Sequence, residues 1–572
     1  MSEELKQLPQ SEEAEKALLG CLMLGGDREQ EIAMAWVRDD DAFYNGDCKD
    51  VWKAFKELYK EQISVDFITV TEKTKEMSNK SLAYFITGLT DFVPSTSNVE
   101  NYAKIVWQKF IQRQTAKSAT KLVNASYDNN GTVKDILTEH TKLIDELKNK
   151  INSGDKVIGP FPLLPLIDNP QLLRKNTEVF VNNVHPKNNI LPLIEPYLGH
   201  SKIRIGYFSP DLSLHPVAYL TAGLYEAHDR DHFEVYAFSF GPASTDGMSL
   251  RIKAGVDHFH NVDSMSHQEI TLLARSLEID VAVDLGGFTA EARPDVFAMS
   301  AAPIQLSYIG YLGTMGADYY DYLIADPMMI PKENQKYYSE KIVYLPSFQV
   351  NDSKDLPPEV SFSRKDAKLP DKGFVFCCFN NTYKITPAVF DSWARILKSV
   401  EGSVLIIYAN DELSKTNLAK EISLRGVDSS RLIFGERLNR DKYLARYRAA
   451  DLFLDTFPCN AGTTASDALK MGLPLLTLKG YSFHSREGAS ILSALNLPEL
   501  ITNTSEEYEA LAIELATNPE KLKIIKDKLV NNLSTAPLYN TPLFTKNLET
   551  AYTEMYERHH KGLEPDHIYV DH

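Results

Sequence analysis

The spacing of hydrophobic residues changes along the chain. In residues 1–151, apolar side chains recur on one helical face, as Ala14, Leu18 and Leu22 do, and this spacing predicts an all-helical region. From about residue 202, short apolar and β-branched runs alternate with helical stretches. This alternation predicts parallel sheets that are covered by helices on both faces.

The predicted strands form two sets. The first set covers 203–209, 233–240, 280–288, 304–311 and 321–326, and the second covers 374–380, 403–410, 431–436, 451–457 and 474–480. A polar, proline-containing stretch at 350–372 separates the two sets. The pattern therefore predicts the α/β class, with two doubly wound Rossmann-like domains that face a cleft.

The same pattern predicts the domain limits. We expect an all-helical domain at 1–151, a linker and the start of the α/β region at 152–201, and Rossmann-like domains at 202–352 and 353–572. The Gly- and Pro-rich stretch that follows residue 151 supports the linker. The amphipathic segment at 541–561 predicts a helix that clasps the two α/β domains.

Composition narrows the range of functions. Lys and Arg number 61 against 78 Asp and Glu, a net charge of −17 that argues against non-specific binding of nucleic acid or anionic lipid. The five Cys lack the spacing of a metal site, so we expect free thiols in a reducing compartment. The N-terminus lacks a signal-peptide pattern and no stretch approaches about 18 apolar residues, so we expect a cytoplasmic protein without a membrane span.

One motif predicts an anion site. In DLFLDTFPCNAGTTASDALKMGLPLLTL (451–478), a strand ends at Asp455 and a Gly-containing turn leads into a helix that begins near Thr463 and Thr464. Backbone N–H groups, hydroxyls and the helix dipole then converge on one point, which suits a phosphate. Asp467, in the same first turns, is placed to accept a hydrogen bond from ribose hydroxyls. The alternative is an ordinary capped helix.

Two further strand ends carry candidate residues. Lys384 lies in the polar turn of FCCFNNTYKITP (376–387), where it can reach a phosphate, and His215 lies on the loop that follows strand 203–209. The alternatives are a solvated lysine and a histidine with a structural role. The chain has no GxxxxGK[ST] motif and no GxGxxG after a strand, which argues against a P-loop or a dinucleotide site.

Many ordered motifs point to one family. They are LRKNTEVFVNNVHP, KIRIGYFSPDLSLHPVAYL, DVAVDLGGFTAEAR, AAPIQLSYIGYLGTMGADYYDYLIAD, YYSEKIVYLP, FCCFNNTYKITPAVF, ADLFLDTFPCNAGTTASDALKMGLPLLTL and SREGASIL. Through them, residues from about 170 to 560 resemble bacterial members of the O-linked N-acetylglucosamine transferase family, which is glycosyltransferase family 41 and includes the SPINDLY-like proteins. The resemblance implies the GT-B fold and an inverting transferase that moves a sugar from a UDP-sugar to a protein hydroxyl. It implies no metal and no cofactor, with the UDP-sugar as co-substrate.

The resemblance also implies roles for individual residues. His215 matches a histidine near the acceptor that has been proposed as a base, and Lys384 matches the lysine that meets the donor diphosphate. The residues implied to bind the donor are Thr289, Ile309, Gly310, Gly313, Asn381, Arg440, Tyr443, Cys459, Asn460, Gly462, Thr463, Thr464 and Asp467.

Two of these positions depart from the family pattern. The family usually has His where this chain has Tyr443, and His where it has Gly462, since the common motif is NxHTT. Gly462 removes a side-chain donor to phosphate, which is worth about 1–3 kcal/mol when the bond is charge-assisted. We therefore expect a weakened donor site, which His at position 462 would strengthen.

The helical region resembles a different family. Residues 7–151, through LPQSEEAEKALLGCLMLGG and ITGLTDFVPSTSNVENYAKIV, are similar to the N-terminal domain of bacterial replicative DNA helicases. The resemblance implies an interaction module that pairs with copies of itself and docks partners, without direct contact to nucleic acid.

Together these observations predict a transferase that moves N-acetylglucosamine from UDP-N-acetylglucosamine to Ser or Thr of a protein. Two alternatives stay open. One is the same fold with another UDP-hexose or an Asn acceptor. The other is an inactive transferase fold that serves as a binding protein and docks a replication partner.

Overall fold

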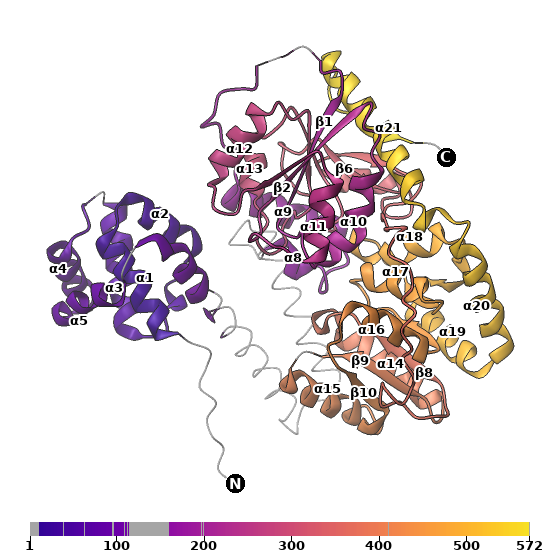
Figure 1. Cartoon of the computed structure of the whole chain (residues 1–572). Coiled ribbons are helices and arrows are strands. Elements are labelled where there is room, and N and C mark those ends of the chain that lie inside the picture. The colour runs from indigo at the N-terminus through magenta and orange to yellow at the C-terminus, as the bar shows by residue number, and fades with distance from the viewer. Residues whose placement is uncertain are drawn as a thin grey trace, which may run out of the picture. The chain divides into compact units, whose positions relative to one another are not determined.

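The structure is a computed structural model, and it describes two stretches of the chain. These are residues 11–113, apart from 38, 62, 94–95, 108 and 111–112, and residues 159–570, apart from 196, 198 and 410. The chain divides into two compact units, Met1–Glu146 and Leu147–His572 (Figure 1).

In the part of the first unit that the structure describes, the regular elements are all helices. Its elements are α1 (Glu12–Leu24), α2 (Asp27–Trp36), η1 (Asp40–Ala42), α3 (Gly46–Lys60), α4 (Phe67–Ser78), α5 (Ala83–Gly88), η2 (Leu89–Phe92) and η3 (Thr96–Asn98). Ser11 caps α1, since its hydroxyl accepts from the N–H of Ala14 at 3.4 Å. The core of the unit includes the buried Leu18, Leu22 and Trp52. The predicted last helix of this region, 132–151, lies outside the described residues.

The second unit contains two parallel sheets, as the sequence predicts. The first consists of β1 (Ile203–Ser209), β2 (Phe233–Ser239), β3 (His258–Asn261), β4 (Val281–Asp284), β5 (Ile304–Ser307), β6 (Tyr322–Ala325), β7 (Lys341–Tyr344) and β14 (Ile568–Tyr569). Their order is β14-β7-β6-β5-β4-β1-β2-β3. The helices of this half are α8 (Pro160–Leu163), α9 (Pro170–Val184), α10 (Pro216–Ala227), α11 (Gly247–Gly255), α12 (His267–Ser276) and α13 (Pro294–Ala298).

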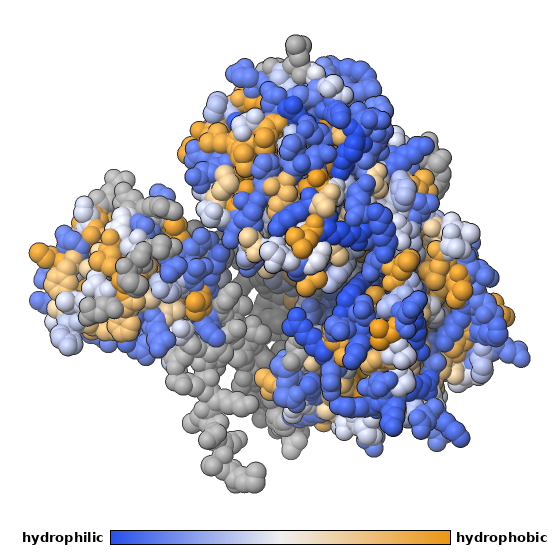
Figure 2. All heavy atoms as spheres, in the orientation of Figure 1, coloured by the Kyte–Doolittle hydropathy of each residue, from blue (hydrophilic) through white to orange (hydrophobic). Residues whose placement is uncertain are grey.

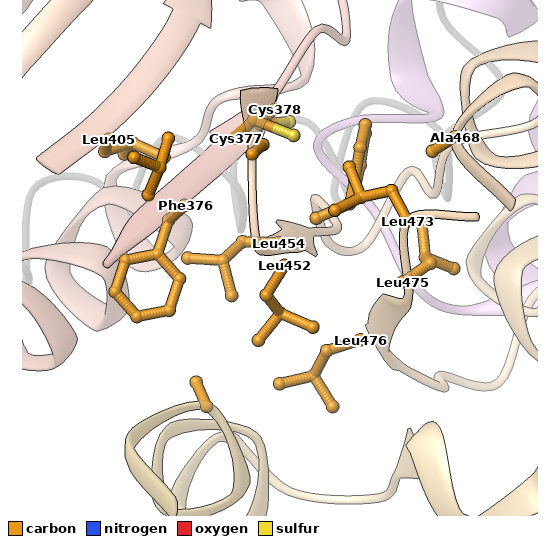
Figure 3. Close-up of a cluster of buried hydrophobic side chains, with 14 of the residues drawn as sticks. Phe376, Cys377, Cys378, Leu405, Leu452, Leu454, Ala468, Leu473, Leu475 and Leu476 are labelled. Atoms are coloured by element: carbon orange, nitrogen blue, oxygen red, sulfur yellow. The ribbon is translucent and has the colours of Figure 1, made fainter. Parts of the chain in front are cut away.

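The second sheet has the order β10-β9-β8-β11-β12-β13. Its strands are β8 (Val375–Cys378), β9 (Val404–Tyr408), β10 (Leu432–Gly435), β11 (Leu452–Leu454), β12 (Leu475–Leu478) and β13 (Ile501–Thr502). The helices that accompany it are α14 (Pro387–Ser399), α15 (Glu412–Leu424), α16 (Arg440–Ala445), α17 (Thr463–Lys470), α18 (Glu487–Ala494), α19 (Ser505–Thr517) and α20 (Pro519–Leu533). Figure 3 shows its buried core, where Phe376, Leu452 and Leu476 lie on neighbouring strands.

Each sheet has one point at which the strand order reverses. In the first sheet it lies between β1 and β4, and in the second it lies between β8 and β11. Loops that leave neighbouring strands at such a point diverge to opposite faces of the sheet and leave a crevice at the carboxyl edge, which is where α/β proteins bind ligands. The loops that carry His215, Lys384 and the 455–467 motif all leave these strands.

The stretch predicted as a linker and the start of the α/β region, 152–201, is described from residue 159 on. Among its described residues, α8 and α9 are helical, and Leu163, Leu164 and Val181 are buried. Asp168, between the two helices, accepts hydrogen bonds from the N–H of Ser482 at 2.7 Å and the hydroxyl of Ser485 at 2.8 Å. This stretch therefore belongs to the α/β unit and connects its two halves.

The C-terminal segment returns to the first α/β domain. Helix α21 (Thr541–His560) packs beside α10, with Leu548 and Tyr552 buried in the core of that domain (Figure 1). Strand β14 then pairs with β7 in the first sheet. The predicted helix is present, and residues 541–570 pack on the first domain.

The face shown in Figure 2 carries both hydrophilic and hydrophobic residues. Figure 2 shows hydrophobic residues of the visible face as patches among hydrophilic ones. Within the stretches that the structure describes, no helix is both long and apolar enough to cross a membrane.

Candidate donor site at the edge of the second sheet

Strands β8 and β11 bring the predicted phosphate residues together. The Nζ of Lys384, which follows β8, donates to the carbonyl oxygen of Asn460, which follows β11, at 2.6 Å. Asn380 links the same two loops, because its Nδ2 donates to the hydroxyl of Thr456 at 2.8 Å and its Oδ1 accepts from the hydroxyl of Thr464. Parallel neighbouring strands end at the same edge, so this contact follows from the predicted topology.

A buried carboxylate shapes the loop between β11 and α17. Asp455 accepts from the N–H groups of Thr456 at 2.8 Å and Ala461 at 2.7 Å, and from the hydroxyl of Thr477 at 2.7 Å. Burial raises the pKa of Asp455 to about 6, although these hydrogen bonds and the charge of Lys384 lower it. The loop is therefore held in one conformation before any ligand arrives.

The start of α17 is open to a ligand. Its N-cap is Gly462, which has no side chain to accept from the first N–H groups of the helix. The N–H of Ala465 donates to the carbonyl oxygen of Gly462 at 2.9 Å, whereas the N–H groups of Thr463 and Thr464 have no intrahelical acceptor. Thr463 and Thr464 lie half-buried in the first turn. N–H groups, hydroxyls and the positive end of the helix dipole meet here, which is an arrangement that suits phosphate.

Lys384 is held as a cation. Burial lowers the pKa of this half-buried lysine, but Cys459, Tyr383, Glu487 and Asp455 around it raise the pKa above its ordinary value. The ammonium group therefore stays protonated at neutral pH and provides a fixed positive charge beside the start of α17.

The predicted ribose residues form an ion-pair network. Both Nη atoms of Arg440 donate to the carboxylate of Asp467 at 2.8 Å, and Nη2 also donates to Asp355 at 2.8 Å. The guanidinium carbon of Arg440 lies 4.4 Å from the ring centroid of Tyr219, on α10 of the first domain. Arg440 therefore orients Asp467 and joins the two domains at this edge.

Tyr443 takes part in an aromatic stack. The guanidinium carbon of the buried Arg446 lies 4.6 Å from the ring centroid of Tyr443 and 3.7 Å from that of Phe379. The hydroxyl of Tyr443 contacts that of Tyr447 at 2.8 Å. Tyr443 thus supplies a ring face, and its hydroxyl is engaged within the protein.

In the first domain, the loops that follow β4 and β5 pack on each other. An ideal Cβ on Gly310 would lie 1.9 Å from the carbonyl oxygen of Leu285, so only glycine fits there. Ile309 has a positive φ of 62°, and an ideal Cβ on Gly313 would lie 2.9 Å from the hydroxyl of Tyr311. The hydroxyl of Thr289 donates to the carbonyl oxygen of Gly286 at 2.9 Å, which closes the loop after β4.

His215 caps α10 at the first domain's switch point. Its Nδ1 accepts from the N–H of Val217 at 3.3 Å and lies 3.5 Å from Asp211. Burial lowers the pKa of His215, so the ring is neutral at pH 7 and an acceptor Nδ1 places the ring proton on Nε2. In this arrangement Nε2 donates a hydrogen bond and cannot accept a proton.

Two further residues that the sequence predicted for this site are Cys459 and Asn381. Cys459 is buried among residues of the first domain, and its carbonyl oxygen accepts from the hydroxyl of Thr456 at 2.7 Å. Asn381 is exposed at the start of η5 (Thr382–Lys384), with no side-chain cap bond. Within 11–113 and 159–570, setting aside the positions not described there, no three His, Cys, Asp or Glu side chains gather as a metal site.

The comparisons with known proteins identify the family. Residues 183–361 and 350–548 match the family model Glycosyl transferase family 41. The chain belongs to this family. Residues 7–108 match the model of the DnaB-like helicase N terminal domain, which confirms the resemblance of the helical region.

Relatives support the same assignment. A probable UDP-N-acetylglucosamine–peptide N-acetylglucosaminyltransferase of Arabidopsis thaliana, SEC, is 35% identical over 379 residues, which are 65% of this chain and 39% of that protein. The Caenorhabditis elegans UDP-N-acetylglucosamine–peptide N-acetylglucosaminyltransferase is 25% identical over 485 residues, covering 64% of this chain and 42% of its own length. The family 41 chain therefore spans about two-fifths of the length of these curated relatives.

A solved structure supports the fold. A mutant of the Thermobaculum terrenum O-GlcNAc transferase is 26% identical, with a TM-score of 0.64, and covers 90% of this chain and 98% of that one. The predicted GT-B fold, with two doubly wound domains and a helical N-terminal region, is confirmed.

The structure adds residues that the motifs did not indicate. Asp355 and Tyr219 complete the network of Arg440, and Arg446 stacks on Tyr443. The burial of Arg446 is seen only in the structure, so the sequence alone did not single it out. Glu487 is the fourth addition; it lies within the quoted motif SREGASIL, but that motif did not indicate a place beside Gly462.

Glu487 changes one expectation. An ideal Cβ on Gly462 would lie 2.3 Å from the Oε1 of Glu487. Histidine at position 462 therefore requires the Glu487 side chain to move first. The expected gain in donor binding from a single Gly462→His substitution does not follow from this geometry.

Proposed function

We propose that this family 41 chain transfers N-acetylglucosamine from UDP-N-acetylglucosamine to Ser or Thr hydroxyls of a protein, with inversion at C1. The proposal rests on one observation above all: Lys384, the start of α17 and the Arg440–Asp467 pair meet at the switch point of the second sheet. These groups suit a diphosphate and a ribose. The names of the relatives supply the sugar and the peptide acceptor.

The site stabilises the charge that transfer produces. An acceptor oxygen forms a bond to C1 while the bond from C1 to the diphosphate oxygen breaks, and the electron pair of that bond leaves with UDP. Lys384 and the N–H groups of α17 stabilise this negative charge where it develops. His215 orients an oxygen through its Nε2–H. To take the acceptor's proton at Nε2, its ring proton must first move to Nδ1, which then releases the N–H of Val217 and faces the carboxylate of Asp211 at 3.5 Å.

We expect transfer that does not depend on a metal ion. Lys384 and α17 neutralise the diphosphate in this proposal, so UDP release from UDP-N-acetylglucosamine continues in excess EDTA. The measurement is UDP release by the purified full chain, together with the intact masses of cellular proteins incubated with it. Activity that vanishes with EDTA and returns with Mn²⁺ or Mg²⁺ would contradict metal independence.

The same assay separates the alternatives. Faster turnover with another UDP-hexose assigns a different donor, and product peptides modified at Asn assign a different acceptor. A chain that neither hydrolyses nor transfers any UDP-sugar is the inactive binding protein that Tyr443 and Gly462 suggested. The protein acceptor and the UDP-sugar are the partners in the proposal, and we place the reaction in the cytoplasm.

The helical unit is proposed as a pairing module. Met1–Glu146 is a compact unit with its own core, and its residues 7–108 match the model of the DnaB-like helicase N terminal domain. We expect the full chain to be an oligomer at micromolar concentration, and a variant that lacks residues 1–146 to be a monomer. Light scattering on both proteins measures this, and a monomeric full chain would exclude the role. No direct contact with nucleic acid is expected.

A further inference from the structure

The first residue of α18 reaches the opening of α17. The carboxylate of Glu487 occupies the space beside Gly462, where an ideal Cβ would lie 2.3 Å from Oε1 and 2.9 Å from Oε2. Any side chain at position 462 would compete for this volume. Because Gly462 has no side chain, the carboxyl group of Glu487 can lie next to the N–H groups at the start of α17.

This carboxyl group is buried and has no fixed partner. Glu487 is 6% exposed, and within the stretches that the structure describes its carboxylate has neither a hydrogen bond nor an ion pair. The titratable groups that face it are Lys384 and Tyr383 on η5, and Asp455 and Cys459 around β11. The residue is buried, yet neither carboxyl oxygen is among the fully buried unpaired atoms, so a ligand at the start of α17 can reach this carboxyl group and become its partner.

The other charged groups nearby are engaged elsewhere. On α17, Asp467 pairs with Arg440 and Lys470 pairs with Asp355. On η8 (Phe483–Ser485), His484 interacts with Asp168 and Lys384, and burial holds its pKa at about 4. None of these contacts involves the carboxyl group of Glu487.

We propose that Glu487 is a donor-binding residue whose protonated carboxyl group donates a hydrogen bond to the diphosphate of the UDP-sugar, in place of a side chain at position 462. The proposal rests on the function proposed above. A carboxylate at this point repels a diphosphate, whereas a protonated carboxyl supplies the donor that Gly462 lacks. Donor binding is then coupled to the uptake of one proton.

The pKa of Glu487 sets the pH range over which donor binding should change. Burial raises the pKa of Glu487 to about 7, although Lys384 lowers it. The binding-competent, protonated form is populated below this pKa and is lost as pH rises through it. Because the apparent dissociation constant scales inversely with the competent fraction, donor affinity should fall about tenfold between pH 6 and pH 8.

The experiment is calorimetric titration of the full chain with UDP-N-acetylglucosamine, without acceptor, from pH 6 to pH 8. This donor has no phosphate that titrates in the range, unlike UDP, whose terminal phosphate titrates near pH 6. Glu487→Gln keeps a donor but cannot titrate, Glu487→Leu has no donor, and Glu520→Gln, an exposed residue of the same domain, is the matched control. Buffers of different ionisation enthalpy measure proton uptake in the unmutated chain.

We expect about tenfold weaker binding at pH 8 and uptake of close to one proton in the unmutated chain and in Glu520→Gln. Glu487→Gln should bind equally at both pH values, and Glu487→Leu should bind weakly at both. Binding that is independent of pH, or a Glu487→Gln variant with the full pH dependence, overturns the role of Glu487 and leaves the transferase intact. A chain that binds no UDP-sugar at any pH overturns the proposed function as well.

Discussion

Replacing Lys384 by Ala or Met should lower the rate of transfer by about 10²–10³-fold, which is the typical cost of removing one group that stabilises developing charge. Lys384 is held protonated, and it lies beside the start of α17 where the diphosphate is proposed to bind. The effect should fall on kcat more than on KM, because the charge on the leaving group grows only as the bond to C1 breaks.

The Met variant tests whether a lower rate comes from the loss of the charge or from a disturbed structure. It keeps the apolar stem of Lys384 and removes the charge, whereas the bond to the carbonyl oxygen of Asn460 is lost in both variants. Thermal unfolding of each variant measures that cost separately. Lys372→Ala, which removes an exposed lysine from the same domain, is the matched control and should leave the rate unchanged. An Ala variant with full activity would show that Lys384 is not the diphosphate contact.

Replacing Asp467 by Asn should raise the KM for UDP-N-acetylglucosamine by about 10- to 100-fold, since a hydrogen bond to a charged group is worth roughly 1.5–3 kcal/mol. The carboxylate is fixed by two hydrogen bonds of 2.8 Å from Arg440, so it is preorganised to accept from ribose hydroxyls. Because the ribose is remote from C1, kcat should change little. Steady-state kinetics over a range of donor concentrations measures both constants.

Asp355→Asn separates ribose binding from the positioning of Arg440. Asp355 also accepts from Arg440, and it pairs with Lys470, yet no ribose contact is assigned to it. Its substitution should therefore raise KM much less than that of Asp467. Equal effects of the two substitutions would mean that Asp467 acts by holding Arg440, and the ribose assignment would then be wrong.

The sequence placed Lys384 and Thr464 after two buried strands, and the structure brings the loops that carry them together. Lys384 follows β8 and Thr464 follows β11, and both strands are continuous apolar runs whose ends are marked by polar turns. Once the strands are parallel and adjacent, the two loops must meet. Strand β13 was not predicted, because its two residues are too few to show an alternation of apolar and polar positions.

The pattern of apolar and polar residues could not predict contacts between segments that lie far apart in the sequence. The carboxyl of Glu487 reaches Gly462 because α18 packs against α17. Nothing in the sequence of either helix indicates that the two helices are in contact. Asp168 likewise holds Ser482 and Ser485 across more than three hundred residues. Such polar contacts depend on tertiary packing, which local propensity does not encode.

Helix α21 and strand β14 belong to the first α/β domain but follow the second domain in the sequence. This arrangement affects the order in which the two domains can fold during synthesis. The second α/β domain is one continuous stretch, and all of its strands, β8 to β13, have been made before α21 begins. The first domain begins earlier, yet β14 and α21, which pack on it, follow all of these strands in the sequence. Since domains generally fold as units, the second α/β domain can fold first on the ribosome, while the first still lacks α21 and β14.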